Sequence, residues 1–482
     1  MVRILRERIY KKFCIAIFFI FICLSFVVSF GFSPNKAYAY SDGGGDIFER
    51  VDKYLSDAVS KAHFPSMSVT VVDKDSELFS KTYGNCRSTD TPFLLGSVSK
   101  SFTALCIMQL VEQGKIDLDA NIAKYLPEAT DGNRITVRQL LNHTGGLGEH
   151  QNLENYKIVE KQGAHTYANV NYSLLGKIVE VVSNESYENY VTEHIFAPLN
   201  MSHSASTYEK SIENGLIGGY ENWFGINVKT KHRYPKCSDA WISVPAGYLS
   251  ASTSDLGKYL QMYLNGGLGI ISGESIDKMF YENVSVRASI PYSYGMGWTL
   301  IKDPLKEPAL RHSGLVETGM SVVYILPERE IGIAIAVNSN DYFVGKDFMD
   351  RIDWGVALLI MGDEPNRIGG SEYGTRHFMY DLIYLVSLTV SVLPLCLLSL
   401  YIKRLKTGKI TFKIAELVSV HLALPIFLLL LSRIIFSTPL WVVRAFVPDM
   451  FTAIVASATL LFAGGIIKLI LLITKTRGSA NC

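Results

Sequence analysis

The sequence predicts an α/β fold: a sandwich of an antiparallel sheet flanked by helices, with an all-α subdomain, followed by a three-helix transmembrane segment. Strand-like patterns stand at both ends of the central region, and residues 120–210 between them are mostly helix and loop. Strands from both ends are expected to share one sheet, with the insertion as a second lobe. Three long apolar runs in the last hundred residues predict the membrane segment.

The first elements of the central region are a helix and a hairpin. Residues 46–62 have the spacing of an amphipathic helix, and 66–72 and 78–83 are strand-like runs around a short turn. A strongly helical stretch, 98–112, ends at Gly114, a residue type common at helix ends.

The strands return near the end of the central region. Residues 294–301, 320–326 and 331–338 are predicted strands, and the turn 327–330 joins the last two. A closing helix is expected over 346–361. A functional site is expected in the cleft between the sheet and the helical lobe.

Composition excludes several functions. The formal net charge is +1, which gives no reason to expect nucleic acid as a partner. Phosphate-loop, HExxH and paired CxxC motifs are missing from the sequence, so no cofactor and no metal are predicted. Cys86, Cys106 and Cys237 are interpreted as small buried side chains, and a Cys86–Cys237 bridge stays open as an alternative.

The N-terminus predicts an export signal. Five Lys and Arg residues precede an apolar run over 13–32, and Ala37-Tyr38-Ala39 has the small residues of a cleavage site. Residues 1–39 are therefore predicted to be a signal peptide, with an uncleaved anchor as the alternative. Either way, residue 40 onward is expected outside the cytoplasm.

Three C-terminal runs are long enough to cross a bilayer as helices: 382–402, 414–436 and 450–473. Lys468 interrupts the third run and is expected to reach toward lipid headgroups. A buried bundle in a soluble protein is the alternative reading of these runs.

The distribution of basic residues predicts the orientation of the spans. Five Lys and Arg residues lie over 403–413, whereas the next loop carries only Arg444. The basic loop and the C-terminus are therefore expected in the cytoplasm, and the central region outside, in a multi-pass protein of the cell membrane. The predicted boundaries are a signal at 1–39, the central domain at 40–365, a linker at 366–379, three transmembrane helices at 380–474 and a cytoplasmic tail at 475–482.

Two weak motifs suggest nucleophilic chemistry. Ser97 opens a helix, where the dipole favours a developing alkoxide, and Lys100 lies one turn away and accepts a proton if it is desolvated. An N-cap serine with a solvated lysine is the alternative. Tyr167 can be held as a phenolate or relay a proton, and Asn169 can bond both substrate and lysine. A core tyrosine is the alternative there.

A third motif, Arg311-His312-Ser313-Gly314-Leu315, stands at the predicted start of a late strand. His312 can line the cleft there, and the glycine lets substrate approach the backbone. The next amide can donate to an oxyanion. A lone histidine is also common as a satisfied structural group.

The order SxxK, YxN, HxG resembles the serine β-lactamase-like hydrolases: class C β-lactamases, low-molecular-weight DD-peptidases and their esterase and D-aminopeptidase relatives. The run 135–147, ITVRQLLNHTGGL, is similar to the LLxHTSGL signature of that family, and 245–256 and 294–298 match as well. The resemblance covers about residues 46–360.

This resemblance implies an acyl-enzyme mechanism with Ser97, Lys100 and Tyr167 as catalytic residues. It also implies an oxyanion hole from the amides of Ser97 and Leu315. The substrate-binding and oxyanion set is then Asn169, His312, Ser313, Gly314 and Leu315. The sequence departs from many β-lactamases at His312, where they carry a lysine that holds the substrate carboxylate. This departure favours neutral amides or esters as substrates.

A second resemblance concerns the architecture. An export signal, this hydrolase domain and three C-terminal spans resemble the prodrug-activating peptidases of the colibactin and zwittermicin pathways, which remove an N-acyl-D-asparagine leader after export. The expected partners are an acylated small-molecule or peptide-like substrate and the lipid bilayer, with an exporter as a further candidate. The alternatives are a DD-peptidase or penicillin-binding protein, a β-lactamase, an esterase, and a β-lactam-binding sensor without turnover.

Overall fold

The structure, a computed structural model, describes residues 46–235, 240–287, 289, 291–302, 305, 307–405 and 410–478. The predicted signal peptide, Cys237 and Cys482 lie outside the described residues. The described residues form two compact units. The sheet unit lies between 46 and 221 and between 227 and 373, and the three-helix unit comprises 222–226 and the part that follows residue 373.

An antiparallel sheet forms the centre of the sheet unit. Its strands are β1 Ser66–Val72, β2 Glu77–Gly84, β7 Val284–Ser285, β8 Tyr292–Tyr294, β9 Thr299–Ile301, β10 Ala309–Val316, β11 Gly319–Leu326 and β12 Ile331–Val337. They lie in the order β2–β1–β12–β11–β10–β9–β8–β7. Because β1 pairs with β12, with Met67 opposite Val337, both ends of the central region share one sheet, as predicted.

The predicted strand 294–301 is wrong in one respect. The structure divides it into β8 and β9, which pair with each other across a turn. Gly297 in that turn has a φ of 82°, and a Cβ there would lie 2.8 Å from Ser101 Cα. The turn therefore packs on the helix that follows Ser97, a tertiary contact that strand patterns do not report.

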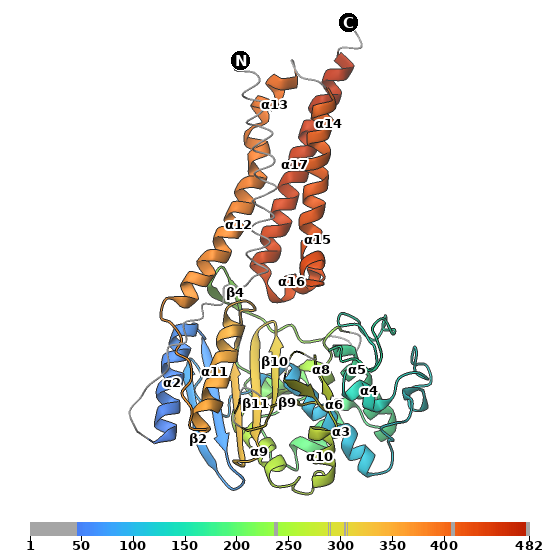
Figure 1. Cartoon of the computed structure of the whole chain (residues 1–482), viewed down its shortest axis with the longest axis vertical. Coiled ribbons are helices and arrows are strands. Elements are labelled where there is room, and N and C mark those ends of the chain that lie inside the picture. Colours follow the sequence, from blue (N-terminus) through green and yellow to red (C-terminus); the bar gives the residue numbers. More distant parts are fainter. Residues whose placement is uncertain are drawn as a thin grey trace. The chain divides into compact units, whose positions relative to one another are not determined.

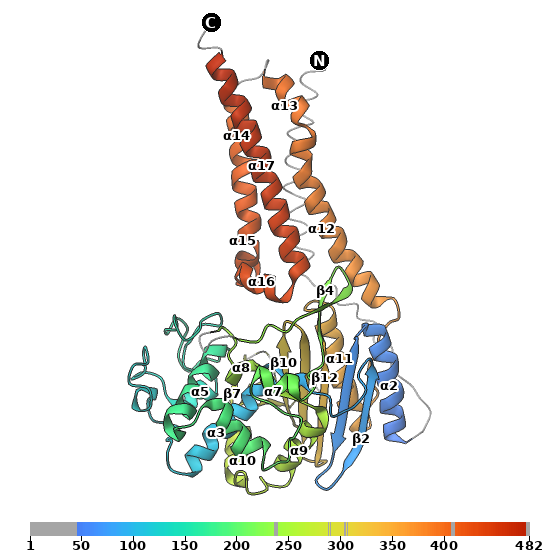
Figure 2. The same cartoon turned by 180° about the vertical axis from the view of Figure 1, so that it is seen from behind.

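Helices cover both faces of the sheet (Figures 1 and 2). α2 Ile47–Ala62 and α11 Gly345–Ile360 lie together on one face, where Gly355 makes room for the ring of Tyr54. α9 Thr253–Leu264 lies on the other face and packs on β1 and β12. Gly257 lets α9 approach Val72 of β1 closely, because a Cβ there would lie 3.0 Å from that side chain.

The second lobe is helical, as predicted. Its elements and the helices beside it are α3 Ser99–Glu112, α4 Val137–Leu141, α5 Asn169–Ser183, α6 Tyr187–Val191, α7 Tyr208–Glu213, α8 Val244–Gly247 and α10 Gly273–Tyr281. In α3 every residue from Ser99 to Leu110 is buried, so this helix runs through the core. Its polar side chains are buried with partners: Ser101 Oγ donates to the carbonyl oxygen of Val98 and Thr103 Oγ1 to that of Pro245.

Two small sheets were not predicted. One joins β13 Ser339–Asn340, β4 Gly219–Trp223 and β5 Ile226–Thr230, and the other joins β3 Phe93–Leu94 and β6 Ser250–Ala251. The second sheet matters for the site, because β3 leads directly into the segment that carries Ser97.

The three-helix unit consists of long helices that lie side by side in both views (Figures 1 and 2). Its elements are α12 Glu372–Cys396, α13 Leu398–Leu405, α14 Ile410–Val418, a π-helical turn Ser419–Ala423, α15 Leu424–Phe436, α16 Leu440–Phe446 and α17 Pro448–Gly478. Three helical stretches, Glu372–Leu405, Lys413–Ile435 and Pro448–Lys475, are long and apolar enough to cross a membrane. α12 thus begins inside the segment predicted as a linker, 366–379.

Lys468 differs from its predicted environment. Only 3% of it is exposed, and its Nζ lies 2.6 Å from Oε1 of Glu416 on α14. The lysine therefore does not reach out of the unit, because a carboxylate on a neighbouring helix neutralises it. A charge buried among apolar helices is expected to have such a partner.

Candidate active site

Ser97 lies in a short 3-10 turn, Gly96–Val98, that leads into α3. Gly96 has a φ of 52°, and a Cβ there would lie 2.3 Å from the backbone nitrogen of Leu315 on β10. Only glycine allows this approach, since any side chain would separate the turn from the strand. The nucleophile candidate is thereby held against the strand that carries the third motif.

Gly314 of β10 approaches the backbone beside the serine turn just as closely. A Cβ at Gly314 would lie 1.9 Å from the carbonyl oxygen of Leu95, and Ser321 Oγ donates to that oxygen at 2.6 Å. β9 pairs with β10 only as far as Arg311, so the edge of β10 is free of β9 from His312 onward. An open edge of this kind can accept an extended substrate as an added strand.

Lys100 is fully buried, and its Nζ has three oxygen neighbours. Asn169 Oδ1 lies at 2.8 Å, the carbonyl oxygen of Ala246 at 2.6 Å and Ser97 Oγ at 3.0 Å. Burial lowers the pKa of Lys100 well below its usual value. A neutral amine has two N–H donors, which match Asn169 and Ala246, and one lone pair, which is left for the hydroxyl proton of Ser97.

Tyr167 lies on the other side of the lysine. The ring centroid of Tyr167 is 4.9 Å from Lys100 Nζ. Burial raises the pKa of Tyr167 well above its usual value, and a side-chain hydrogen bond with Ser97 opposes this shift only in part. Of the two roles left open by the sequence, the raised pKa favours a neutral phenol that relays protons over a standing phenolate.

His143 is a residue to which the sequence analysis gave no role. It is fully buried, with a φ of 56°. Its Nδ1 accepts from the amide N–H of Ala168 at 3.3 Å and lies 2.9 Å from Asn171 Nδ2. Because a backbone N–H can only donate, the ring proton belongs on Nε2. The imidazole therefore clamps the residues that follow Tyr167.

The same histidine also holds Tyr167 from two further directions. Its ring centroid lies 4.4 Å from that of Tyr167, and its carbonyl oxygen accepts from Thr166 N at 2.8 Å. Burial, and then the nearby Lys100, keep its pKa well below the usual value, so the ring is neutral. The LLxHTSGL-like run was the only signal of this residue in the sequence, and the run does not reveal these contacts.

His312 is buried and neutral. Its Nδ1 lies 2.6 Å from the carbonyl oxygen of Gly297, so the N–H of that nitrogen donates to it. Burial lowers the pKa of His312 to about 3, and the positive charge of Arg311 acts in the same direction. No fixed positive charge stands where many β-lactamases carry a lysine. Ser313, the next residue, is exposed on the strand.

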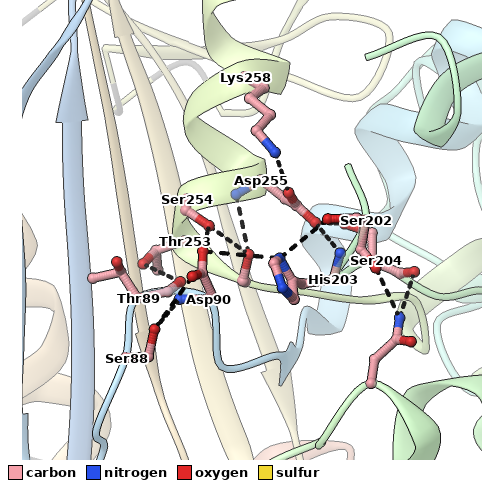
Figure 3. A network of polar contacts seen from close by, with 12 residues as sticks. Ser88, Thr89, Asp90, Ser202, His203, Ser204, Thr253, Ser254, Asp255 and Lys258 are labelled. Carbon is pink, nitrogen blue, oxygen red and sulfur yellow. Dashed lines mark hydrogen bonds and ion pairs between the residues drawn. The ribbon is translucent and has the colours of Figure 1, made fainter. Parts of the chain in front are cut away.

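A network of polar contacts surrounds the buried Asp255 near the start of α9 (Figure 3). Asp255 Oδ2 accepts from His203 N at 2.7 Å and from Ser204 Oγ at 3.0 Å. Asp255 lies in the first turn of α9, which directly follows β6, and β6 pairs with β3. The carboxylate thus fastens a loop of the helical lobe to the segment that delivers the serine turn.

The predicted site residues are therefore brought together to different degrees. Ser97, Lys100, Tyr167 and Asn169 form one contact group, and Gly314 and Leu315 lie against the serine turn. His312 faces the group through Tyr294, with ring centroids 5.9 Å apart. Within the described residues, His, Cys, Asp and Glu side chains form no group of three or more that could hold a metal ion.

Comparison with known proteins agrees with this arrangement. Protein flp of Staphylococcus aureus (strain N315) is 26% identical over 336 residues, which cover 62% of this chain and 65% of that protein. The chain thus spans just under two thirds of the length of this relative.

Solved structures show the same fold. The octameric penicillin-binding protein homologue from Pyrococcus abyssi has 26% identity and a TM-score of 0.58, over 68% of this chain and 79% of that one. A D-stereospecific amidohydrolase from Streptomyces sp. has 21% identity and a TM-score of 0.51, over 61% of this chain and 94% of that one. The family model described as Beta-lactamase matches residues 51–356. This match covers the sheet, the serine turn and the helical lobe together, and the chain therefore belongs to the beta-lactamase family.

Proposed function

We propose that this protein is a serine hydrolase: a membrane-anchored, extracytoplasmic peptidase that cleaves an amide through an acyl-enzyme and removes an N-acyl-D-asparagine leader from an exported prodrug. The observation that carries the amide chemistry is the environment of Lys100. Its Nζ lies among Ser97 Oγ, Asn169 Oδ1 and the Ala246 carbonyl, and burial lowers its pKa. A neutral amine in that place is a base for the serine hydroxyl.

In the proposed acylation step, Ser97 Oγ attacks the substrate carbonyl and its proton passes to Lys100 Nζ. The amides of Ser97 and Leu315 receive the oxyanion, since the tight approach at Gly96 holds Leu315 N against the serine turn. Tyr167, neutral and next to Ser97, gives its proton to the leaving amine and takes the proton held by Lys100, so that both side chains end the step neutral. The C–N bond breaks, an ester to Ser97 remains, and water hydrolyses that ester.

The neutral state of His312 supports a substrate without a free carboxylate beyond the scissile bond. A prodrug leader continues past that bond as a large amine, so nothing there requires a fixed positive charge. The Streptomyces enzyme indicates that this fold can serve D-stereospecific amide hydrolysis. The three long apolar stretches support an anchor in the membrane, to which an acyl chain on the substrate would also partition.

The substrate proposal is tested with purified full-length protein and four substrates: N-myristoyl-D-asparagine anilide, its L-isomer, nitrocefin and a short-chain nitrophenyl ester. We expect cleavage of the D-anilide and a rate at least about tenfold lower for the L-isomer, which corresponds to about 1.4 kcal/mol. Ser97→Ala is the matched control and should cleave none of them. Rapid nitrocefin turnover without D-anilide cleavage would make the protein a β-lactamase instead.

The proposed orientation is tested separately in intact cells. The sheet unit should be digested by an added protease, and Cys482, which lies outside the described residues, should stay unlabelled by a membrane-impermeant thiol reagent. Labelling of Cys482 from outside would contradict the three-span arrangement.

A further inference from the structure

The β4–β5 hairpin ends in an unusual turn. Its two loop residues, Phe224 and Gly225, both have positive φ, 54° and 76°. Two-residue hairpin loops of this type favour Asn-Gly or Asp-Gly, because a bulky side chain is disfavoured in the left-handed region. A phenylalanine in this strained position indicates that its ring has a functional role there.

The strand after the turn exposes an apolar row. Phe224 is 42% exposed, Ile226 66% and Val228 43%. Ile226 and Val228 are two residues apart on β5 and so share one face, and Phe224 stands in the turn just before them. Two exposed lysines, Lys229 and Lys231, follow at positions that alternate with those of Ile226 and Val228. Exposed aromatic and aliphatic side chains close together are typical of segments at a membrane–water interface.

The tip itself, residues 222–226, belongs to the three-helix unit. The N–H of Phe224 donates to Asp449 Oδ2 at 3.1 Å, and the Phe224 ring lies 6.2 Å from that of Tyr384 on α12. Asp449 is the second residue of α17, whose apolar stretch begins at Pro448. The tip is therefore level with the end of a membrane-length helix, where lipid headgroups meet water.

We propose that the tip of the β4–β5 hairpin is a second membrane attachment, in which Phe224 and Ile226 enter the interfacial layer of the phospholipid bilayer. This inference rests on the membrane location in the proposed function. The tip then meets the membrane at a second place along the chain, and an acyl chain on a substrate would partition into the same bilayer.

The first test places a photo-crosslinking residue, benzoylphenylalanine, at Ile226 in the full-length protein in native membranes. We expect phospholipid adducts by mass spectrometry. The same residue at Val181, which is 58% exposed on α5, is the control and should give none. A crosslinked dimer of two chains would show a contact between copies instead, and that result, like the absence of any adduct at 226, would overturn the proposal.

The second test uses Phe224→Asn, which suits the left-handed turn and so should not disturb the fold. Leu268→Asn is the matched control, because Leu268 is 59% exposed and has a φ of 46°. In proteoliposomes we expect Phe224→Asn to raise the KM for the N-myristoyl-D-asparagine anilide about threefold or more, and to leave the N-acetyl analogue unchanged.

The two tests separate the possible failures. Equal KM values for Phe224→Asn and Leu268→Asn on the myristoyl substrate would overturn the hairpin's role while the proposed function stands. No cleavage of either anilide by the unaltered protein would overturn the proposed function, and the crosslinking at 226 would still decide the attachment.

Discussion

Replacing His143 tests whether the clamp behind Tyr167 is needed for catalysis. In His143→Ala, the N–H of Ala168 and the amide of Asn171 lose the acceptor that they now share. A buried donor left unpaired costs about 1–3 kcal/mol, so the two together cost about 2–6 kcal/mol if they stay in place. We expect the segment to shift instead. A displacement of about 1 Å at Tyr167 would lower kcat about 100-fold.

The companion variant is His143→Asn. Its side-chain oxygen can replace Nδ1 as the acceptor, and asparagine tolerates the φ of 56° observed at this position. We expect His143→Asn to keep kcat within about tenfold of the unaltered protein, and KM of both variants to change little, since the hydrogen bonds of the His143 ring are made with the segment that follows Tyr167.

The assay is kcat per active site, with active sites counted by end-point labelling with a fluorophosphonate. This count removes any loss of folded protein, which a merely structural role would also cause. The reasoning would be refuted if His143→Ala kept a kcat per labelled site within about threefold of the unaltered protein, or if His143→Asn were impaired as strongly as His143→Ala.

Three further predictions concern other contacts. Gly96→Ala should lower kcat/KM by about 100-fold or more, whereas Gly114→Ala, also at positive φ but with nothing within 4 Å of its Cβ, should not change it. The fluorophosphonate labelling rate should fall as pH falls through the lowered pKa of Lys100, because only the neutral amine accepts a proton. His312→Gln should show the same fall in rate at low pH, since a group with a pKa of about 3 is already neutral in that range. Glu416→Gln should lower the free energy of unfolding in detergent by about 3–5 kcal/mol, measured as a lower unfolding temperature. The double variant Glu416→Gln, Lys468→Met should recover most of this loss, and no recovery would show that the two residues do not act as a pair.

Local patterns predicted the elements whose form depends on their own residues. The helix at 47–62, the strand at 66–72 and the closing helix follow hydrophobic spacing, and the structure has them within one or two residues of the prediction. The break at Gly297 could not be predicted, because it depends on packing against Ser101, which is distant in sequence. The β4–β5 hairpin also escaped prediction, since its turn contains Phe224 where Asn is usual.

In the candidate site too, local motifs could be predicted and long-range contacts could not. The order of Ser97, Lys100, Tyr167 and His312 was visible as motifs, and the family resemblance joined them. The clamp by His143 was not visible, because its Nδ1 accepts from residues 25 and 28 positions later. The neutral state of His312 was expected from its ordinary pKa, but the size of the shift comes from burial, which only the fold provides.

The pair formed by Glu416 and Lys468 has a consequence for how the chain is made. The two residues are 52 positions apart, on the second and third membrane-length stretches. During synthesis Glu416 leaves the ribosome first and has no ammonium partner until the third stretch emerges. The second stretch is therefore incomplete as an inserted helix until translation has passed Lys468. A chain that stops earlier lacks the ammonium group that neutralises this carboxylate.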